Sequence, residues 1–124
     1  MSIEVRSDQT LAPRTTLGIG GPARHLVEAF SIDHVVEALD WVKLESIPLY
    51  VLGGGSNLVV SDNGVEGLVL QMMTQGIEVV SEDSDYIDLR VAAGHSWDDL
   101  VRFACEQNYQ GIECLSGIPG TVGA

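Results

Sequence analysis

The chain has 124 residues, 45% of them apolar and 6% aromatic, and its formal net charge is −12. This length suits a single domain of ordinary size, and the apolar content is enough for a core built mainly from Val, Leu, Ile and Ala, which argues against disorder. The six basic residues form no cluster, no segment approaches the roughly 20 apolar residues of a membrane span, and the N-terminus lacks a signal-peptide pattern, so nucleic acid and membranes are poor partners.

The N-terminal part of the chain predicts a strand followed by a helix. Met1–Pro13 is polar and unpatterned, and we expect a flexible segment with ordered structure starting near Thr15. Ala23–Phe30 is the first apolar signal and predicts a short strand. Ser31 is a suitable N-cap, and apolar residues at helical spacing then predict a helix from Ile32 to about Leu44.

Three more short apolar runs follow. Leu49–Leu52 lies between a proline and a glycine and predicts a buried strand, while Leu58–Ser61 and Gly67–Gln71 predict strands around an Asp62-Asn63-Gly64 turn. Strand, helix and strand in this order indicate a small parallel α/β unit. We therefore expect residues 14–71 to form a first subdomain.

The pattern changes after Met72, where we expect a second subdomain over residues 72–124. Ile77–Ser81 and Tyr86–Ala92 flank a polar stretch, which predicts an antiparallel hairpin. A capping-box sequence begins at Ser96, and the apolar residues that follow have helical spacing. The sequence therefore predicts a helix after the hairpin.

The two cysteines and the last residue give three further expectations. Cys105 and Cys114 are nine residues apart without a C-x-x-C motif or a nearby paired histidine, so we expect core packing rather than a metal site, in a reducing bacterial-type cytosol. Because Ala124 lies inside a loop that is neither capped nor polar, we expect a fragment of a longer protein. An open cofactor cleft in such a fragment could promote self-association.

Glycine is the compositional outlier, with 14 residues gathered in three loops. Gly53–Gly55 follows an apolar strand directly and can direct several N–H groups into one concavity that binds an anion such as a pyrophosphate. Ser56 and Asn57 either contact ligand oxygens or stabilise the turn. From these residues alone, a ligand site and a purely structural turn both remain open.

Two common nucleotide motifs do not fit. The loop at Gly53–Asn57 lacks the Gly-Lys-Ser/Thr ending of a P-loop, and the segment after it reads as a strand rather than a helix. A formal G-x-G-x-x-A match occurs at Gly18–Ala23, but it precedes a predicted strand, whereas the dinucleotide fingerprint precedes a helix. Neither fold class is therefore predicted.

Three segments taken together, in this order and spacing, resemble the MurB family of UDP-N-acetylenolpyruvoylglucosamine reductases. They are Thr16–Ala23 (TLGIGGPA), Leu52–Leu58 (LGGGSNL) and Leu115–Ala124 (LSGIPGTVGA). The resemblance covers the chain from about Pro13 onward. It departs at Thr15, where the family commonly has Asn, so a contact made by that Asn is in doubt here.

The resemblance implies an α/β (α+β) FAD-binding fold of the vanillyl-alcohol-oxidase/PCMH type, with two subdomains of which the second is truncated. It also implies that the Gly53 loop binds the FAD pyrophosphate and that the C-terminal loop passes along the opposite side, toward the isoalloxazine. The implied cofactor-binding residues are Leu52, Gly53, Gly54, Gly55, Ser56, Asn57, Gly94, Ser116, Gly117, Ile118, Pro119, Gly120, Gly123 and Ala124. Gly94 is a weaker candidate.

The implied activity is reduction of UDP-N-acetylglucosamine enolpyruvate to UDP-N-acetylmuramate with NADPH as co-substrate, in peptidoglycan biosynthesis in the bacterial cytoplasm. The family's catalytic Arg, Ser and Glu and its UDP-sugar domain would lie downstream of Ala124, so we expect no catalytic residue and no turnover in this chain alone. Arg14, Arg24, Arg90 and Arg102 are expected to serve surface or structural pairing. Alternatives are another FAD enzyme of the same fold and a non-catalytic binding module.

Overall fold

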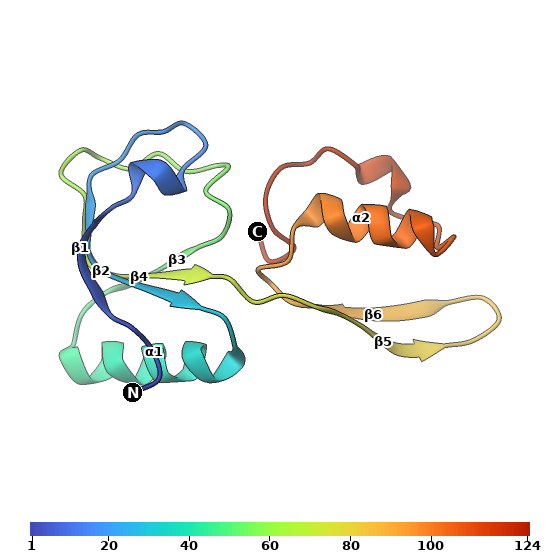
Figure 1. The fold of residues 1–124 in the computed structure, drawn as a ribbon, viewed down its shortest axis with the longest axis horizontal. Coiled ribbons are helices and arrows are strands. Elements are labelled where there is room, and N and C mark those ends of the chain that lie inside the picture. The colour runs from blue at the N-terminus through green and yellow to red at the C-terminus, as the bar shows by residue number, and fades with distance from the viewer.

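The computed structural model describes residues 1–124 and contains two sheets, one in each half of the chain (Figure 1). The larger sheet has four strands in the order β1-β2-β4-β3. Strands β2 and β3 both run parallel to β4, and β1 pairs antiparallel with β2. The strands are β1 (Arg6–Thr10), β2 (Pro22–Ala29), β3 (Leu49–Leu52) and β4 (Val65–Met72).

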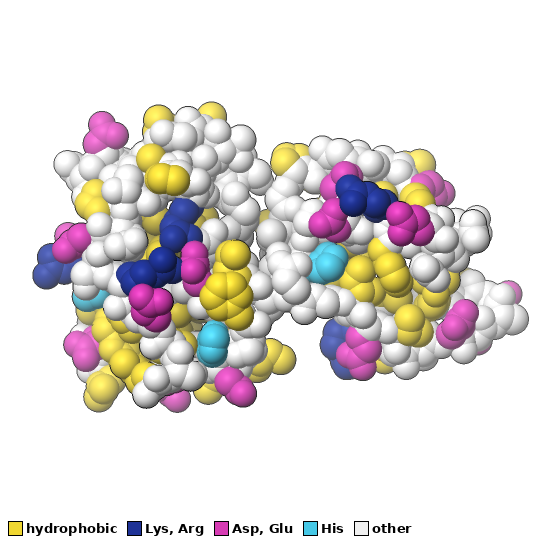
Figure 2. All heavy atoms as spheres, in the orientation of Figure 1, with side chains coloured by type: hydrophobic (Ala, Val, Ile, Leu, Met, Phe, Trp, Pro, Cys, Tyr) yellow, Lys and Arg dark blue, Asp and Glu magenta, His cyan; other side chains and the backbone are white.

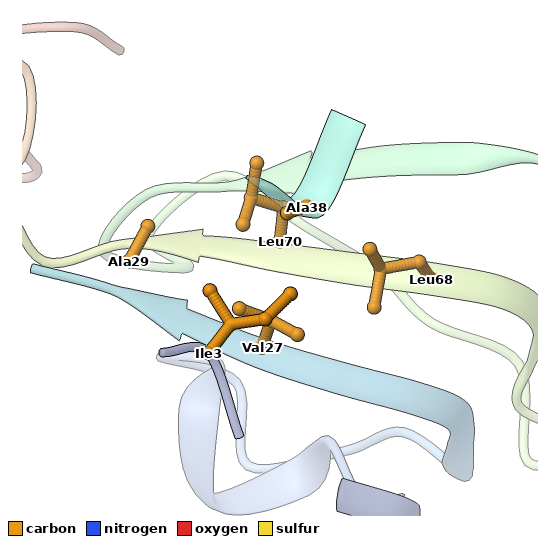
Figure 3. Close-up of a cluster of buried hydrophobic side chains, with 6 residues drawn as sticks. All are labelled: Ile3, Val27, Ala29, Ala38, Leu68 and Leu70. Carbon is orange, nitrogen blue, oxygen red and sulfur yellow. The ribbon is translucent and has the colours of Figure 1, made fainter. Parts of the chain in front are cut away.

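Helix α1 (Ile32–Glu45) connects β2 to β3 and covers one face of this sheet. It begins where the Ser31 side chain accepts a hydrogen bond from the His34 N–H, and it ends at Ser46, whose φ of 55° is left-handed. Residues that alternate along β2 and β4 point at this helix because side chains of a strand alternate between its faces. The resulting buried cluster, drawn in Figure 3, consists of Ile3, Val27, Ala29, Ala38, Leu68 and Leu70.

The opposite face of the sheet has a second buried cluster, covered by loops and by the 3₁₀ helix η1 (Ala12–Arg14) rather than by an α-helix. It consists of Leu11, Ala23, Leu26, Leu52, Val60 and Val69. Near the outer edge of the first cluster, the rings of His25 and Trp41 meet edge to face with centroids 5.1 Å apart. The first half of the chain therefore has a sheet that is packed on both faces.

The second half contains a hairpin, a helix and a short 3₁₀ turn. Strands β5 (Ile77–Glu82) and β6 (Ile87–Val91) pair antiparallel, α2 (Trp97–Glu106) follows, and η2 is Glu113–Leu115. The Asp99 N–H donates to the Ser96 side chain at the start of α2. Only three apolar side chains of this half are buried, and all belong to α2: Leu100, Val101 and Ala104.

An apolar groove of about 490 Å³ lies between β6 and α2, and Figure 2 shows the corresponding apolar patch between these elements. Ile87 and Leu89 line it from the strand, and Trp97 and Leu100 line it from the helix. The hairpin and α2 are thus only partly in contact.

Most of the predicted elements are confirmed. The strands at Ala23–Phe30, Leu49–Leu52 and Gly67–Gln71, the helix capped by Ser31, the parallel unit, the hairpin and the Ser96-capped helix all appear within a few residues of their expected bounds. No helix is both long enough and apolar enough to cross a lipid bilayer.

Three expectations are wrong. Order does not start near Thr15, because Met1–Pro13 contains β1 and buries Ile3, and the Ser2 N–H and Ser2 hydroxyl both donate to Glu37. Leu58–Ser61 is irregular and belongs to neither sheet, although Val60 is buried in the second cluster and Val59 is exposed as in a strand.

Both cysteines, Cys105 and Cys114, are exposed free thiols rather than core residues. Cys105 is exposed although it lies one helical turn after buried Val101, and Cys114 lies in η2, which has no buried residue. The absence of a motif at these positions did not imply burial.

Candidate functional site

The first glycine loop, Gly53–Asn57, begins directly after β3, at the carboxyl end of the parallel strands, where open α/β sheets bind ligands. Gly55 is buried and has a φ of +71°, and a Cβ at this position would lie 2.0 Å from the Arg14 carbonyl oxygen. The Thr16 N–H donates to the Gly55 carbonyl at 2.9 Å. The chain around η1 therefore holds the loop closely from one side, and only glycine fits there.

The N–H groups of the first glycine loop are not used inside the chain. Outside the helices and strands the chain makes 24 backbone hydrogen bonds, and none is donated by a residue from Gly53 to Asn57. A run of N–H groups without internal acceptors at a glycine turn has the chemistry that anion-binding concavities use. These donors fit a diphosphate.

The second glycine loop, Ser116–Ala124, is fastened to the connection between β6 and α2. Ser96 and Thr121 form an isolated antiparallel bridge, in which the Trp97 N–H donates to Gly120 and the Val122 N–H donates to the His95 carbonyl. The Gly123 N–H donates to the Ala93 carbonyl at 2.9 Å. A Cβ at Gly123 would lie 2.8 Å from the Ala93 Cβ, so this contact also requires glycine.

The structure brings the two glycine loops together, although the first ends 59 residues before the second begins. A Cβ at Gly53 would lie 2.9 Å from Thr121 Oγ1, and a Cβ at Gly54 would lie 3.5 Å from Gly120 Cα. A Cβ at Gly120 would in turn lie 3.1 Å from Ser56 Oγ. Main chain therefore lies directly against main chain where the two halves meet.

Asp98 at the start of α2 holds the beginning of the second glycine loop. Its Oδ1 accepts hydrogen bonds from the Gly117 N–H at 2.9 Å and the Ser116 hydroxyl at 3.1 Å. The Gly117 N–H, followed by the Ser116 hydroxyl, holds the pKa of this carboxyl below its usual value. The indole N–H of Trp97 donates to the Leu115 carbonyl at 2.9 Å, so both ends of this short segment are attached to α2.

The other predicted cofactor-binding residues have varied surroundings. Ile118 and Pro119 are exposed at the tip of the second glycine loop, and Ala124 contacts the position of a Cβ on Gly53 at 3.7 Å. Gly94 is buried behind the loops, where its N–H donates to Thr74 Oγ1 at 3.1 Å. Because a Cβ at Gly94 would lie 2.6 Å from the Thr74 N atom, packing alone requires this glycine.

Thr121 and Thr16 contact the site but are absent from the residues predicted to bind the cofactor. Thr121 lies inside the C-terminal motif, and its position between two predicted glycines is the signal that could have identified it. Nothing local to Thr16 indicates its hydrogen bond to Gly55, because that contact joins residues 39 apart.

The surroundings of the loops are apolar, and four of the five arginines lie in ion pairs, whereas Arg24 lies in none. Leu52 and Leu58, at the two ends of the first glycine loop, line an apolar cavity of about 480 Å³. Arg14, Arg90 and Arg102 each pair with an acidic side chain, and on the face in Figure 2 every basic group lies beside acidic ones. No group of His, Cys, Asp and Glu side chains is arranged to hold a metal ion.

Comparison with known proteins agrees with this geometry. A family model described as an FAD binding domain matches residues 23–124. A solved crystal structure, that of UDP-N-acetylenolpyruvylglucosamine reductase (MurB) from Thermus caldophilus, is similar with a TM-score of 0.74 and 34% identity, covering 98% of this chain and 40% of that chain.

Curated relatives are similar over most or all of this chain. UDP-N-acetylenolpyruvoylglucosamine reductase of Cutibacterium acnes is 46% identical over 117 residues, which are 94% of this chain and 31% of the relative. The enzyme of the same name from Pseudomonas aeruginosa is 43% identical over 124 residues, which are 100% of this chain and 36% of the relative. This chain thus spans about a third of the length of these relatives.

Proposed function

We propose, from the premise that this chain belongs to the FAD binding domain family, that its two glycine loops together bind the diphosphate of FAD. One observation carries the proposal: the N–H groups of Gly53–Asn57 have no acceptor within the chain, and this loop faces the second glycine loop. Backbone N–H groups aimed at one point stabilise phosphate oxygens without a cationic side chain.

The fit of the cofactor rests on the three glycines as well as on the donors. Gly53, Gly54 and Gly120 carry no side chain where the two loops meet, so a linear diphosphate that lies along both loops meets only main chain at these residues. Ser56 and Asn57 add short polar side chains at the exit of the first glycine loop. The apolar walls beside the loops suit the ring systems at the two ends of such a cofactor.

We further infer that the longer protein containing this chain reduces UDP-N-acetylglucosamine enolpyruvate with NADPH, in peptidoglycan biosynthesis in the bacterial cytoplasm. FAD, when bound, supplies the hydride transfer between the two substrates. The share of this chain is to bind and orient the cofactor. The identities of 43% and 46% to reductases of this name support the assignment. The sugar-binding and proton-donating groups are proposed to lie outside the 124 residues, so the chain alone has no turnover.

The test uses the 124-residue chain, free FAD and two substitutions at Gly54. A Cβ at this position meets only ordinary contacts, so Gly54→Asn and Gly54→Asp should both fold. We expect Gly54→Asp to weaken FAD binding by about tenfold or more relative to the same-sized Gly54→Asn, because its carboxylate repels the diphosphate. Calorimetric titration measures both affinities.

Riboflavin, which lacks phosphate, should bind far more weakly than FAD, and ADP should compete with FAD because it has the diphosphate. Equal affinities of the Asp and Asn variants for FAD would contradict the proposal. So would a wild-type chain that binds riboflavin as tightly as FAD.

A further inference from the structure

The side chain of Arg14 connects two strands of the larger sheet at one rung. Its Nη1 donates to Glu28 Oε1 at 2.7 Å and also to Gln71 Oε1. Glu28 of β2 and Gln71 of β4 are register partners, and Gln71 is in turn the register partner of Leu52 on β3. The first glycine loop begins at Gly53, directly after Leu52. Arg14 is therefore hydrogen-bonded to the row of paired residues from which this loop starts.

The main chain of Arg14 contacts the same loop two residues further on. Its carbonyl oxygen would lie 2.0 Å from a Cβ at Gly55, and the nearby Thr16 N–H donates to the Gly55 carbonyl at 2.9 Å. The guanidinium thus holds the start of the loop through the sheet, while the adjoining main chain holds its middle. Arg14 therefore acts on both sides of Gly53 and Gly54, through Gln71 beside Leu52 and through Gly55.

Arg6 provides an internal comparison because it pairs with the same carboxylate. Its Nη2 lies 2.6 Å from Glu28 Oε2, but it reaches Glu28 from β1, at the opposite edge of the sheet from β3. Both guanidinium groups are largely shielded, with side chains 29% exposed for Arg6 and 21% for Arg14. The two arginines therefore share the Glu28 carboxylate, but only Arg14 also bonds Gln71 and adjoins the first glycine loop.

We propose that Arg14 is a positioning residue that fixes the N–H groups of Gly53–Asn57 in the orientation that binds a diphosphate. This inference rests on the proposed function of that loop. Arg14 acts through the sheet rung and through Gly55 rather than by touching the ligand. Loss of its side chain removes the hydrogen bonds that tie η1 to Glu28 and Gln71, so the main chain that contacts Gly55 is held less firmly.

The experiment compares Arg14→Gln, Arg14→Lys and Arg6→Gln in the 124-residue chain. Calorimetric titration with FAD gives affinity, and two-dimensional amide NMR without ligand reports the positions of Gly53–Ser56. We expect Arg14→Gln to weaken FAD binding by about tenfold and to shift these amide signals, while Arg6→Gln changes the affinity by less than about threefold and leaves the signals in place. Arg14→Lys should recover part of the affinity, because one ammonium can reach both acceptors.

The FAD titration and the ligand-free NMR comparison distinguish failure of the positioning role from failure of the proposed function. If Arg6→Gln and Arg14→Gln have equal effects on both readouts, or if Arg14→Gln moves neither, the positioning role is overturned. If wild-type chain binds no FAD, the proposed function fails, and the ligand-free NMR comparison still decides whether Arg14 orients the loop. Should Arg14→Gln not fold, Arg14→Lys against Arg6→Gln gives the same comparison.

Discussion

The sheet beneath the first glycine loop contains both clusters of buried apolar side chains, whereas the hairpin and helix beneath the second loop bury three apolar residues. The first loop is supported by packing on two faces of a four-stranded sheet. The second depends on a handful of hydrogen bonds to residues 93–98 and borders an open apolar groove. A ligand bound by both loops therefore contacts a well-packed first half and a second half that it must help to order, since few buried contacts mean low local stability.

Gly55→Ala tests the well-packed first half and should have the largest effect on the free energy of unfolding. The new methyl group would lie 2.0 Å from a backbone oxygen in a residue of positive φ, so we expect a loss of about 3 to 5 kcal/mol in unfolding free energy, measured by urea denaturation. Gly117→Ala in the second loop is the control. It has a φ of +84° but no atom within 4 Å, and about 1 kcal/mol is expected. Similar costs would show that the first loop can relax.

A pair of leucines compares the two cores directly. Leu70 is 1% exposed in the packed sheet, and we expect Leu70→Ala to cost about 3 kcal/mol because it leaves a closed cavity. Leu100 lines the open groove of the second half, so Leu100→Ala should cost only about 1 to 2 kcal/mol. Denaturation midpoints of the two variants measure the difference. Equal costs would mean that the groove is closed in solution and that the contrast between the halves is false.

The smallest expected effect is a pH-dependent change in the second glycine loop, caused by titration of the Asp98 carboxyl. Hydrogen bonds from Gly117 and Ser116 lower the pKa of Asp98, so their contribution is complete above the ordinary carboxyl pKa of about 3.9 and is lost as pH falls through the lowered value. We expect the Gly117 amide signal to move as pH falls below about 4, and this step to be absent in Asp98→Asn. Asp99→Asn, which removes the partner of Arg102 instead, should leave the step unchanged. A step that survives in Asp98→Asn would place the titrating group elsewhere.

The sequence predicted those parts of the fold that depend on local patterns, namely helix caps and apolar runs. Ser31 and Ser96 mark helix starts, and the apolar runs of β2, β3 and β4 are long enough to read. The resemblance to the MurB family and the implied FAD-binding fold of the vanillyl-alcohol-oxidase/PCMH type are confirmed by the family match and by the similar crystal structure. The strand β1 could not be predicted, because its residues RSDQT carry no apolar alternation and pair mainly through main chain.

The candidate site could be predicted only as separate loops. The motifs indicated Gly53–Asn57 and Ser116–Ala124, but their contact depends on how the two halves pack, which no local pattern records. Arg14 shows the same limit: it was expected to form a structural or surface pair, which it does, yet its link to Gly55 joins residues 41 apart. Which of the implied cofactor-binding residues touch FAD stays a prediction.

The chain has two tryptophans, one in each half. Trp41 lies against His25 beneath the packed sheet, and Trp97 donates its indole N–H to Leu115 beside the second glycine loop. Each half thus contains its own intrinsic fluorophore. Replacing either one with phenylalanine leaves a tryptophan emission signal that reports on one half of the chain, so the order in which the two halves loosen can be followed without any added label.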